Sequence, residues 1–331
     1  MGGRIMKTID VRQPITPVVN IKNLNPLNES VDFHTIRQGK ATNTLAKIKT
    51  VIDNPAQLNL YGGAVITTEK DYKLFIEQYN ELINGVRPTA KMLLDALVIK
   101  LTESGQQDTL VQLPLSDYME MRGLRDIKSA REQVKEDIRA LDRLRIEYRE
   151  KQKGKQGDFL NVNISGGTNG IVRGVIIFRF NQDFFNVLMK YNIMPYPKEI
   201  LSFNLNNNPN SPHLLRRISE HKNMNYGKAN EDIIGVKTLI EASPPLPKYE
   251  EIKDIGGIEQ RIIKRFERDM DAIQSLKWNY CGKNGTEIET PTTYTEFEQA
   301  KIKITWTSYP IRQLKTPAKR KASKKKPPEN K

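Results

Sequence analysis

The sequence contains the same amphipathic helix pattern twice, at an offset of 132 residues, and an alternating strand pattern follows each copy. Residues 126–144 align without gaps with residues 258–276, and similar residues recur in both: Val134 with Phe266, Asp137 with Asp269, Ile138 with Met270, Ala140 with Ala272, Leu141 with Ile273, Leu144 with Leu276 and Tyr148 with Tyr280. Any two amphipathic helices can be aligned in some register, but this agreement continues past the helix. It therefore favours two similar units built around the same core positions.

The segments around the first copy indicate a winged helix. We expect one helix from Thr67 to Asn84 and a second that begins at Pro88, because apolar residues recur there at helical spacing. An extended run (TLVQLPL) and a short helix opened by Ser116 come next, and Asp126 caps the long helix. The alternating segment RIEYREKQKGKQGDFLNVNIS then predicts a hairpin. A helix-turn-helix of this kind places its second helix in the major groove of DNA.

The second half repeats this plan. Ser211 and Pro212 open the helix HLLRRISEHKN, the short helix IGVKTLIEAS follows, and Ile258 begins a long helix that runs to about Leu276. LKWNYCGKNG and AKIKITWTSYP form the second hairpin. The predicted fold is α+β, with two tandem winged-helix domains. The predicted limits are a loosely ordered N-terminal arm (1–65), two winged-helix domains (66–203 and 204–314) and a disordered basic tail (315–331).

The charge of the chain indicates a polyanionic partner. The 331 residues carry a net charge of +14, and the tail, with eight Lys or Arg and one Glu, supplies +7 of it. The other 314 residues therefore also carry +7, so the folded part is expected to have a basic surface. The tail would add sequence-independent, salt-sensitive affinity for DNA. A basic soluble protein without such a partner remains an alternative.

Each long helix is predicted to bury one face and expose a basic one. In the first, Ile127, Ala130, Val134, Ile138 and Leu141 are expected to pack inward. In the second, the inward set is Ile258, Ile262, Phe266, Met270 and Ile273. The candidate DNA-binding residues on the outer faces are Arg125, Lys128, Ser129, Glu132, Lys135 and Arg139, and then Gln260, Arg261, Lys264, Arg265 and Arg268. Arg and Gln read guanine and adenine edges, and Lys neutralises phosphate. The alternative is a solvated helix face with spaced ion pairs.

Lysines at the two hairpins are candidates for phosphate contacts. Lys151, Lys153 and Lys155 surround the tip of the first hairpin, and Lys277 and Lys283 are expected to flank the tip of the second. Flexible basic tips also occur without a function.

Several other classes of protein are disfavoured. The single cysteine, Cys281, excludes an intramolecular disulfide and a Cys-rich zinc site and suggests a reducing cytoplasm. The apolar run GVIIF is too short to span a bilayer, and no export signal is visible. The three histidines are isolated, and no GxxxxGK[ST] loop is present. We therefore expect no catalytic residues, no metal and no cofactor.

The order of elements resembles the theta-type plasmid replication initiators, which are built from two tandem winged helices. The resemblance covers roughly residues 66–314 and includes the segments PTAKMLLDALVIKL, RDIKSAREQVKEDIRALDRLRIEYRE and RGVIIFRFNQDFFNVLMKY. It implies that both domains bind direct repeats at an origin as a monomer. It also implies a dimer through the first domain that represses the protein's own gene, and recruitment of host replication proteins.

The function expected from the resemblance is sequence-specific binding of double-stranded DNA at a replication origin. By position, the best candidates for base contacts are Lys128, Ser129, Gln260, Arg261, Lys264, Arg265 and Arg268. One alternative is a transcriptional regulator that binds an operator with the same apparatus. Another is an interaction protein whose basic rows meet acidic proteins.

Overall fold

The computed structural model describes residues 32–39, 42, 64–65, 72–76, 87–149, 159–282 and 285–310. Residues 31–309 form one compact unit. The basic tail and the tip of the first hairpin lie outside the described residues.

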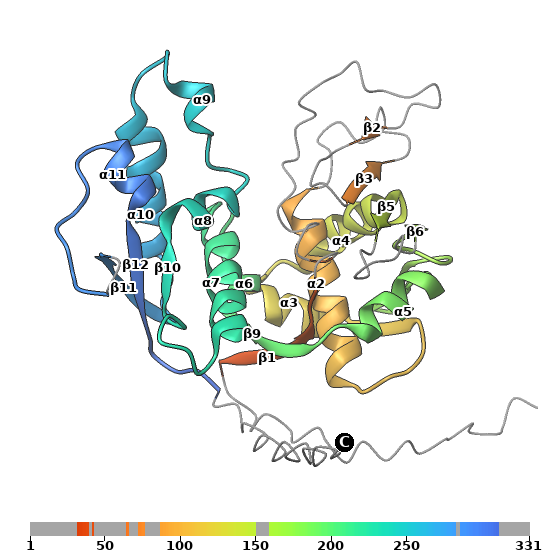
Figure 1. Cartoon of the computed structure of the whole chain (residues 1–331). Coiled ribbons are helices and arrows are strands. Elements are labelled where there is room, and N and C mark those ends of the chain that lie inside the picture. Colours follow the sequence, from red (N-terminus) through yellow and green to blue (C-terminus); the bar gives the residue numbers. More distant parts are fainter. Residues whose placement is uncertain are drawn as a thin grey trace, which may run out of the picture. The chain divides into compact units, whose positions relative to one another are not determined.

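The first half alternates short strands with helices (Figure 1). Its helices are α2 (Pro88–Glu103), α3 (Leu115–Arg122), α4 (Ile127–Asp142), α5 (Gln182–Lys190) and α6 (Glu199–Ser202). Its strands are β1 (Phe33–Arg37), β2 (Ala64–Val65), β3 (Tyr72–Ile76), β4 (Leu110–Pro114), β5 (Leu144–Arg149), β6 (Phe159–Asn163), β7 (Gly170–Val172), β8 (Val175–Arg179) and β9 (Ile193–Pro197). Pro88 is the first residue of α2, where its missing N–H is not needed, and Gly123 ends α3 in the left-handed conformation.

The second half has fewer strands. Its helices are α7 (Ser211–Asn225), α8 (Val236–Glu241), α9 (Tyr249–Ile252), the π-helical turn η3 (Glu259–Ile263), α10 (Lys264–Asp271) and α11 (Tyr294–Gln299). Its strands are β10 (Ile233–Gly235), β11 (Leu276–Cys281) and β12 (Lys301–Trp306). Both predicted hairpins are confirmed: β5 pairs with β6, and β11 pairs with β12, each antiparallel.

The same three-stranded sheet occurs in both halves. The strand orders are β4-β8-β7 and β10-β12-β11, and in each case the first strand leads directly into the short helix. The hydrogen bond at that junction is also repeated: Leu115 N donates to Gly174 O (2.8 Å) and Val236 N to Ala300 O (3.0 Å). The predicted pair of winged helices is therefore confirmed. The hairpin after α4, predicted as the wing of the first winged helix, does not have that place, because β5 and β6 belong to a second sheet with β2 and β3. β7 and β8 take the position in the first half that β11 and β12 have in the second.

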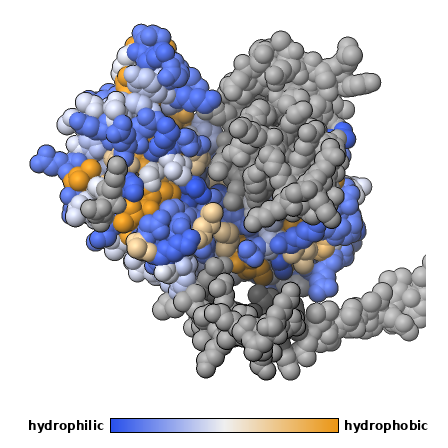
Figure 2. Space-filling view, in the orientation of Figure 1, coloured by the Kyte–Doolittle hydropathy of each residue, from blue (hydrophilic) through white to orange (hydrophobic). Residues whose placement is uncertain are grey.

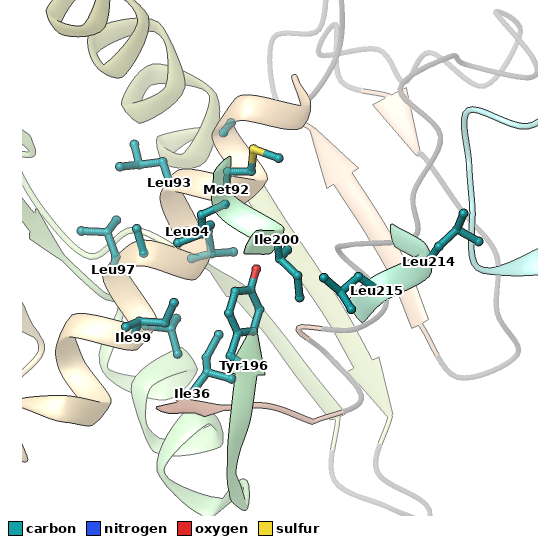
Figure 3. Close-up of a cluster of buried hydrophobic side chains, with 14 of the residues drawn as sticks. Ile36, Met92, Leu93, Leu94, Leu97, Ile99, Tyr196, Ile200, Leu214 and Leu215 are labelled. Carbon is teal, nitrogen blue, oxygen red and sulfur yellow. The ribbon is translucent and has the colours of Figure 1, made fainter. Parts of the chain in front are cut away.

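One continuous core connects the two halves. It is made mainly of aliphatic side chains of α2, α4 and α7 together with the inner faces of the sheets. Figure 3 shows a part of it, in which leucines of α2 lie near Ile36 of β1, Tyr196 of β9 and Ile200 of α6. All of these side chains are buried.

A buried polar cluster lies within this core. Asp95 of α2 accepts hydrogen bonds from Arg216 of α7 (2.5 Å) and from the hydroxyl of Tyr196 (2.8 Å). Glu220, one turn after Arg216, accepts a hydrogen bond from Gln38 (2.8 Å). Buried charges are tolerated when they are paired in this way. The cluster joins the first helices of the two winged helices.

Two predictions for the N-terminal part of the chain need correction. The helix expected over 67–84 is wrong for 72–76, which form β3 and pair with β5. Within those five residues the apolar spacing fits a strand as well as a helix, and the antiparallel partner decides the outcome. Residues 33–37, expected in a loosely ordered arm, form β1, which pairs with β9 and buries Phe33 and Ile36.

Candidate nucleic-acid interface

The first turn of α4 projects beyond the core. Asp126 caps it as predicted, since its carboxylate accepts the N–H groups of Lys128 and Ser129 (both 3.1 Å). The hydroxyl of Ser129 donates to the same carboxylate, and together these donors lower the pKa of Asp126. All five residues from Arg125 to Ser129 are exposed. A capped and accessible helix start is what a recognition helix presents to base edges.

Cations continue along the outer face of α4, as the sequence predicted. The exposed side chains after the first turn are Arg131, Glu132, Lys135 and Arg139. Lys135 lies 2.7 Å from Glu132, whose pKa its hydrogen bond lowers, and Arg139 is paired with Glu136. Ion pairs between exposed groups contribute little to stability. This half of the row has the features of a solvated face.

Three other cations of this region make no contact with a carboxylate among the described residues. They are Arg125, Lys128 and Arg131. Arg131 is not among the candidates that the sequence indicates. At roughly 100° per residue it lies between buried Ile138 and exposed Lys135, at the border of the core face, where periodicity alone does not decide exposure.

Ile127 contradicts the predicted inward face of α4. Its side chain is 58% exposed, whereas Ala130, Val134, Ile138 and Leu141 are buried as expected. The angle of Ile127 around the helix matches the core face. Its position along the helix axis does not, because the first turn extends past the last residues that could cover it.

The second recognition helix consists of η3 followed by α10. All five predicted residues, Gln260, Arg261, Lys264, Arg265 and Arg268, are exposed. The core residues Ile262, Phe266, Met270 and Ile273 are buried, and Ile258 is partly buried. The π-helical turn also buries Ile263, directly after Ile262. The helix ends at Asp271, five residues before the predicted end at Leu276.

The exposed cations of this helix differ in their contacts. Lys264 pairs with Glu267 (3.2 Å), and Arg268 pairs with the fully buried carboxylate of Asp269 (2.8 Å). Arg261 and Arg265 contact no carboxylate among the residues that the structure describes. These two guanidinium groups are therefore available to an anionic ligand without loss of an existing ion pair.

A buried aspartate fixes each recognition helix to the start of the first helix of its winged helix. Asp137 accepts a hydrogen bond from the hydroxyl of Thr89 in α2 (2.7 Å), and burial raises the pKa of Asp137 to about 6. Asp269 accepts two hydrogen bonds from Asn210 at the start of α7, from the backbone N (2.9 Å) and from Nδ2 (2.7 Å). The repeated aspartate of the sequence thus has the same structural role in both halves.

The lysines of the hairpins are only partly described. Lys151, Lys153, Lys155 and Lys283 lie outside the described residues. Lys277 is exposed, but it is the second residue of β11 and pairs in register with Thr305. Lys277 therefore lies at the end of the hairpin next to the recognition helix. The prediction that it flanks the tip is wrong.

The described surface is mainly hydrophilic on the face that Figure 2 shows, with smaller apolar patches. Among the described residues no group of three or more His, Cys, Asp or Glu side chains is placed to hold a metal ion. In the same part of the chain, no helix combines the length and the apolar character that a bilayer crossing requires.

The two repeated sheets, each with an exposed cationic helix after the short helix, place the chain in the winged-helix class. Residues 75–203 match the family model described as initiator replication protein, WH1. This match confirms the resemblance to replication initiators that the sequence indicated. The similarity to initiator replication proteins thus covers the first winged helix, over residues 75–203.

The other comparisons find only distant similarity. No curated protein sequence matches the chain. A crystal structure of domains 2 and 3 of RctB is similar at a TM-score of 0.44 and 12% identity, and it covers 81% of this chain and 99% of that one. A second structure of RctB domains 2–3 gives a TM-score of 0.38 and 11% identity, over 79% and 96% of the two chains.

Proposed function

We propose that this protein binds double-stranded DNA in a sequence-specific manner at a replication origin and initiates replication of a plasmid or similar mobile element. The observation that carries the proposal is the pair of exposed cationic recognition helices in a chain whose first domain matches an initiator family. Arg261 and Arg265 have no competing carboxylate in the described part of the chain, which suits them to bidentate contacts with guanine or with phosphate.

The contact surface follows from the two helices and the two hairpins. In the first domain it comprises Arg125, Lys128, Ser129, Glu132, Lys135 and Arg139, with Lys151, Lys153 and Lys155 of the hairpin. In the second it comprises Gln260, Arg261, Lys264, Arg265 and Arg268, with Lys277 and Lys283. The N-terminal residues of each helix contact base edges, and the hairpin lysines contact phosphates.

The proposed partners are origin direct repeats, a second copy of the chain through the first domain, and host replication proteins. The dimer would repress the protein's own gene. A transcriptional regulator would use the same DNA-binding surface, but its target would be an operator only. Replication activity therefore distinguishes the two functions, whereas DNA binding alone does not.

The test combines footprinting with an origin assay. The DNA that flanks the gene is footprinted with the purified full chain, and the protected fragment is joined to a marker that lacks an origin. We expect protection of spaced direct repeats, and replication of the marker only when the protein is supplied. Protection without replication would support the regulator instead. Arg265→Ala, which removes a cation of the second recognition helix, should weaken the protection of these repeats. Lys190→Ala removes an exposed lysine of α5 and serves as its charge-matched control.

A further inference from the structure

The helix start described above contains an aliphatic side chain among cations. Ile127 is the first residue of α4 and is 58% exposed. Lys128 and Ser129 follow it directly, Arg125 precedes it by two residues, and all three are exposed. A single exposed aliphatic residue is common on protein surfaces and needs no explanation by itself. Ile127, however, lies in the first turn of the recognition helix, which is the part expected to contact base edges.

The local structure holds this side chain in place. The Asp126 carboxylate accepts the N–H groups of Lys128 and Ser129, so two hydrogen bonds close the turn that contains Ile127. A β-branched side chain also has few χ1 rotamers in a helix. Its apolar surface is therefore presented in a defined direction, at little entropic cost upon binding.

The charged residues around Ile127 indicate the class of ligand that contacts its side chain. At roughly 100° per residue, Ile127 lies about 40° from Arg131 and about 80° from Lys135 around the helix. These cations form one border of the basic row, which favours a polyanion. In the major groove of B-DNA, the apolar group that each thymine exposes is its C5-methyl.

We propose that Ile127 is a specificity-determining residue that contacts a thymine C5-methyl group in the half-site bound by the first domain. The inference rests on the proposed function and deepens it. It assigns a thymine to the base pairs read by the first turn of α4, beside the phosphates and bases contacted by Arg125 and Lys128.

The test removes the methyl group from the DNA and the aliphatic group from the protein. Each thymine of the footprinted half-site is replaced singly by uracil, which differs only by the C5-methyl, and Kd is measured by fluorescence anisotropy with the full chain. For the natural protein we expect one or two of these replacements to weaken binding about three- to five-fold, the size expected for one buried methyl group. Ile127→Ser should weaken binding to the thymine site by a similar factor and should abolish the difference between thymine and uracil.

Two controls accompany this pair. Ile127→Val keeps a β-branched apolar side chain and should retain the difference. Met224→Ser changes an exposed apolar residue of α7, outside the proposed contact surface, and should alter neither affinity nor the difference. Circular dichroism should show the same folded state for all variants, because the substituted side chains are exposed.

The outcomes separate this inference from the proposed function. A protected half-site that contains no thymine, or a uracil effect that persists in Ile127→Ser, overturns the assignment of Ile127 and leaves the proposed function standing. If no DNA fragment is bound in preference to another, the proposed function fails and the assignment fails with it.

Discussion

Two arginines of the second recognition helix, Arg265 and Arg268, differ in their carboxylate partners. Arg265 has no carboxylate partner in the described part of the chain, whereas Arg268 is bound to Asp269, which in turn accepts hydrogen bonds from Asn210. Replacement of either arginine removes a cation from the same face. Only the replacement of Arg268 also disturbs a buried contact that fixes the helix.

Arg265→Ala should therefore lower DNA affinity alone, whereas Arg268→Ala should lower both affinity and stability. Each lost base contact is expected to cost about 1–3 kcal/mol of binding free energy. Anisotropy measures affinity, and urea denaturation measures the free energy of unfolding. Unchanged site affinity in the double variant Lys264→Ala/Arg268→Ala would remove the end of this helix from the proposed interface.

Asp137 gives the chain a pH dependence of a definite sign. Burial raises the pKa of Asp137 to about 6, above the value of about 3.9 expected in the unfolded chain. Between pH 4 and 6 the folded state therefore binds the proton that the unfolded state releases. Stability should fall as the pH rises through this window, by about 2–3 kcal/mol.

Asp137→Asn is the matched variant for this effect. It keeps an acceptor for the hydroxyl of Thr89 and has no proton to lose, so it should be more stable than the natural protein above pH 6. Urea denaturation at several pH values between 4 and 7 measures the difference. If the free energy of unfolding of the variant depends on pH as steeply as that of the natural protein, other groups cause the pH dependence.

At the scale of elements, the N-cap of α4 controls the shape of the first turn. Asp126→Ala removes the acceptor for the N–H groups of Lys128 and Ser129. We expect faster hydrogen exchange of these two amides and weaker binding to the specific site, because the first turn must then be ordered upon binding. The amides of α10 should exchange at their natural rate, and equal acceleration there would indicate general destabilisation instead.

Long elements with a strong pattern could be predicted from the sequence. α2, α4 and α7 begin at or within one residue of the Pro, Asp and Ser signals that marked their starts. The repeated aspartates, Asp137 and Asp269, indicated that the two long helices are packed in the same way. Periodicity also placed Gln260, Arg261 and Lys264 outside, even though the π-helical turn was not foreseen.

Features that depend on tertiary neighbours could not be predicted. The strand over 72–76 is defined by its pairing with β5, and no local residue signals that partner. The exposure of Ile127 depends on where the core ends along the helix axis, which a helical wheel does not contain. The partners of the recognition-helix cations, such as Asp269 for Arg268, depend on side-chain conformations in the folded chain.

At the scale of the whole molecule, a buried ion pair connects the two winged helices. Arg216→Met removes the partner of Asp95 and leaves this carboxylate in the core with Tyr196. The loss of one member of a buried pair is expected to cost about 3–5 kcal/mol. Replacement of both residues by apolar ones, Asp95→Leu/Arg216→Met, should recover most of that loss. Urea denaturation checks both variants, and a double variant that is less stable than the single one would show that the pair is net stabilising.

The distribution of charge along the chain predicts two separable contributions to DNA binding. Residues 315–331 carry +7, equal to the charge of the remaining 314 residues. Since the tail has no large apolar residue around which to fold, we expect it to contribute through the release of counterions from phosphates, which is independent of sequence and decreases with salt. Removal of 315–331 should therefore weaken specific and random DNA by the same factor and reduce the slope of log K against log salt.

The recognition-helix variants should show the opposite behaviour. Arg265→Ala should weaken the specific site more than random DNA and leave most of the salt slope, because a base contact releases few counterions. Titrations of specific and random duplexes at several salt concentrations, with the full chain, the truncated chain and Arg265→Ala, measure all of these quantities together. If the truncation weakens binding to the specific site only, the two contributions are not separable. Base-specific affinity would then depend on the tail as well as on the two helices.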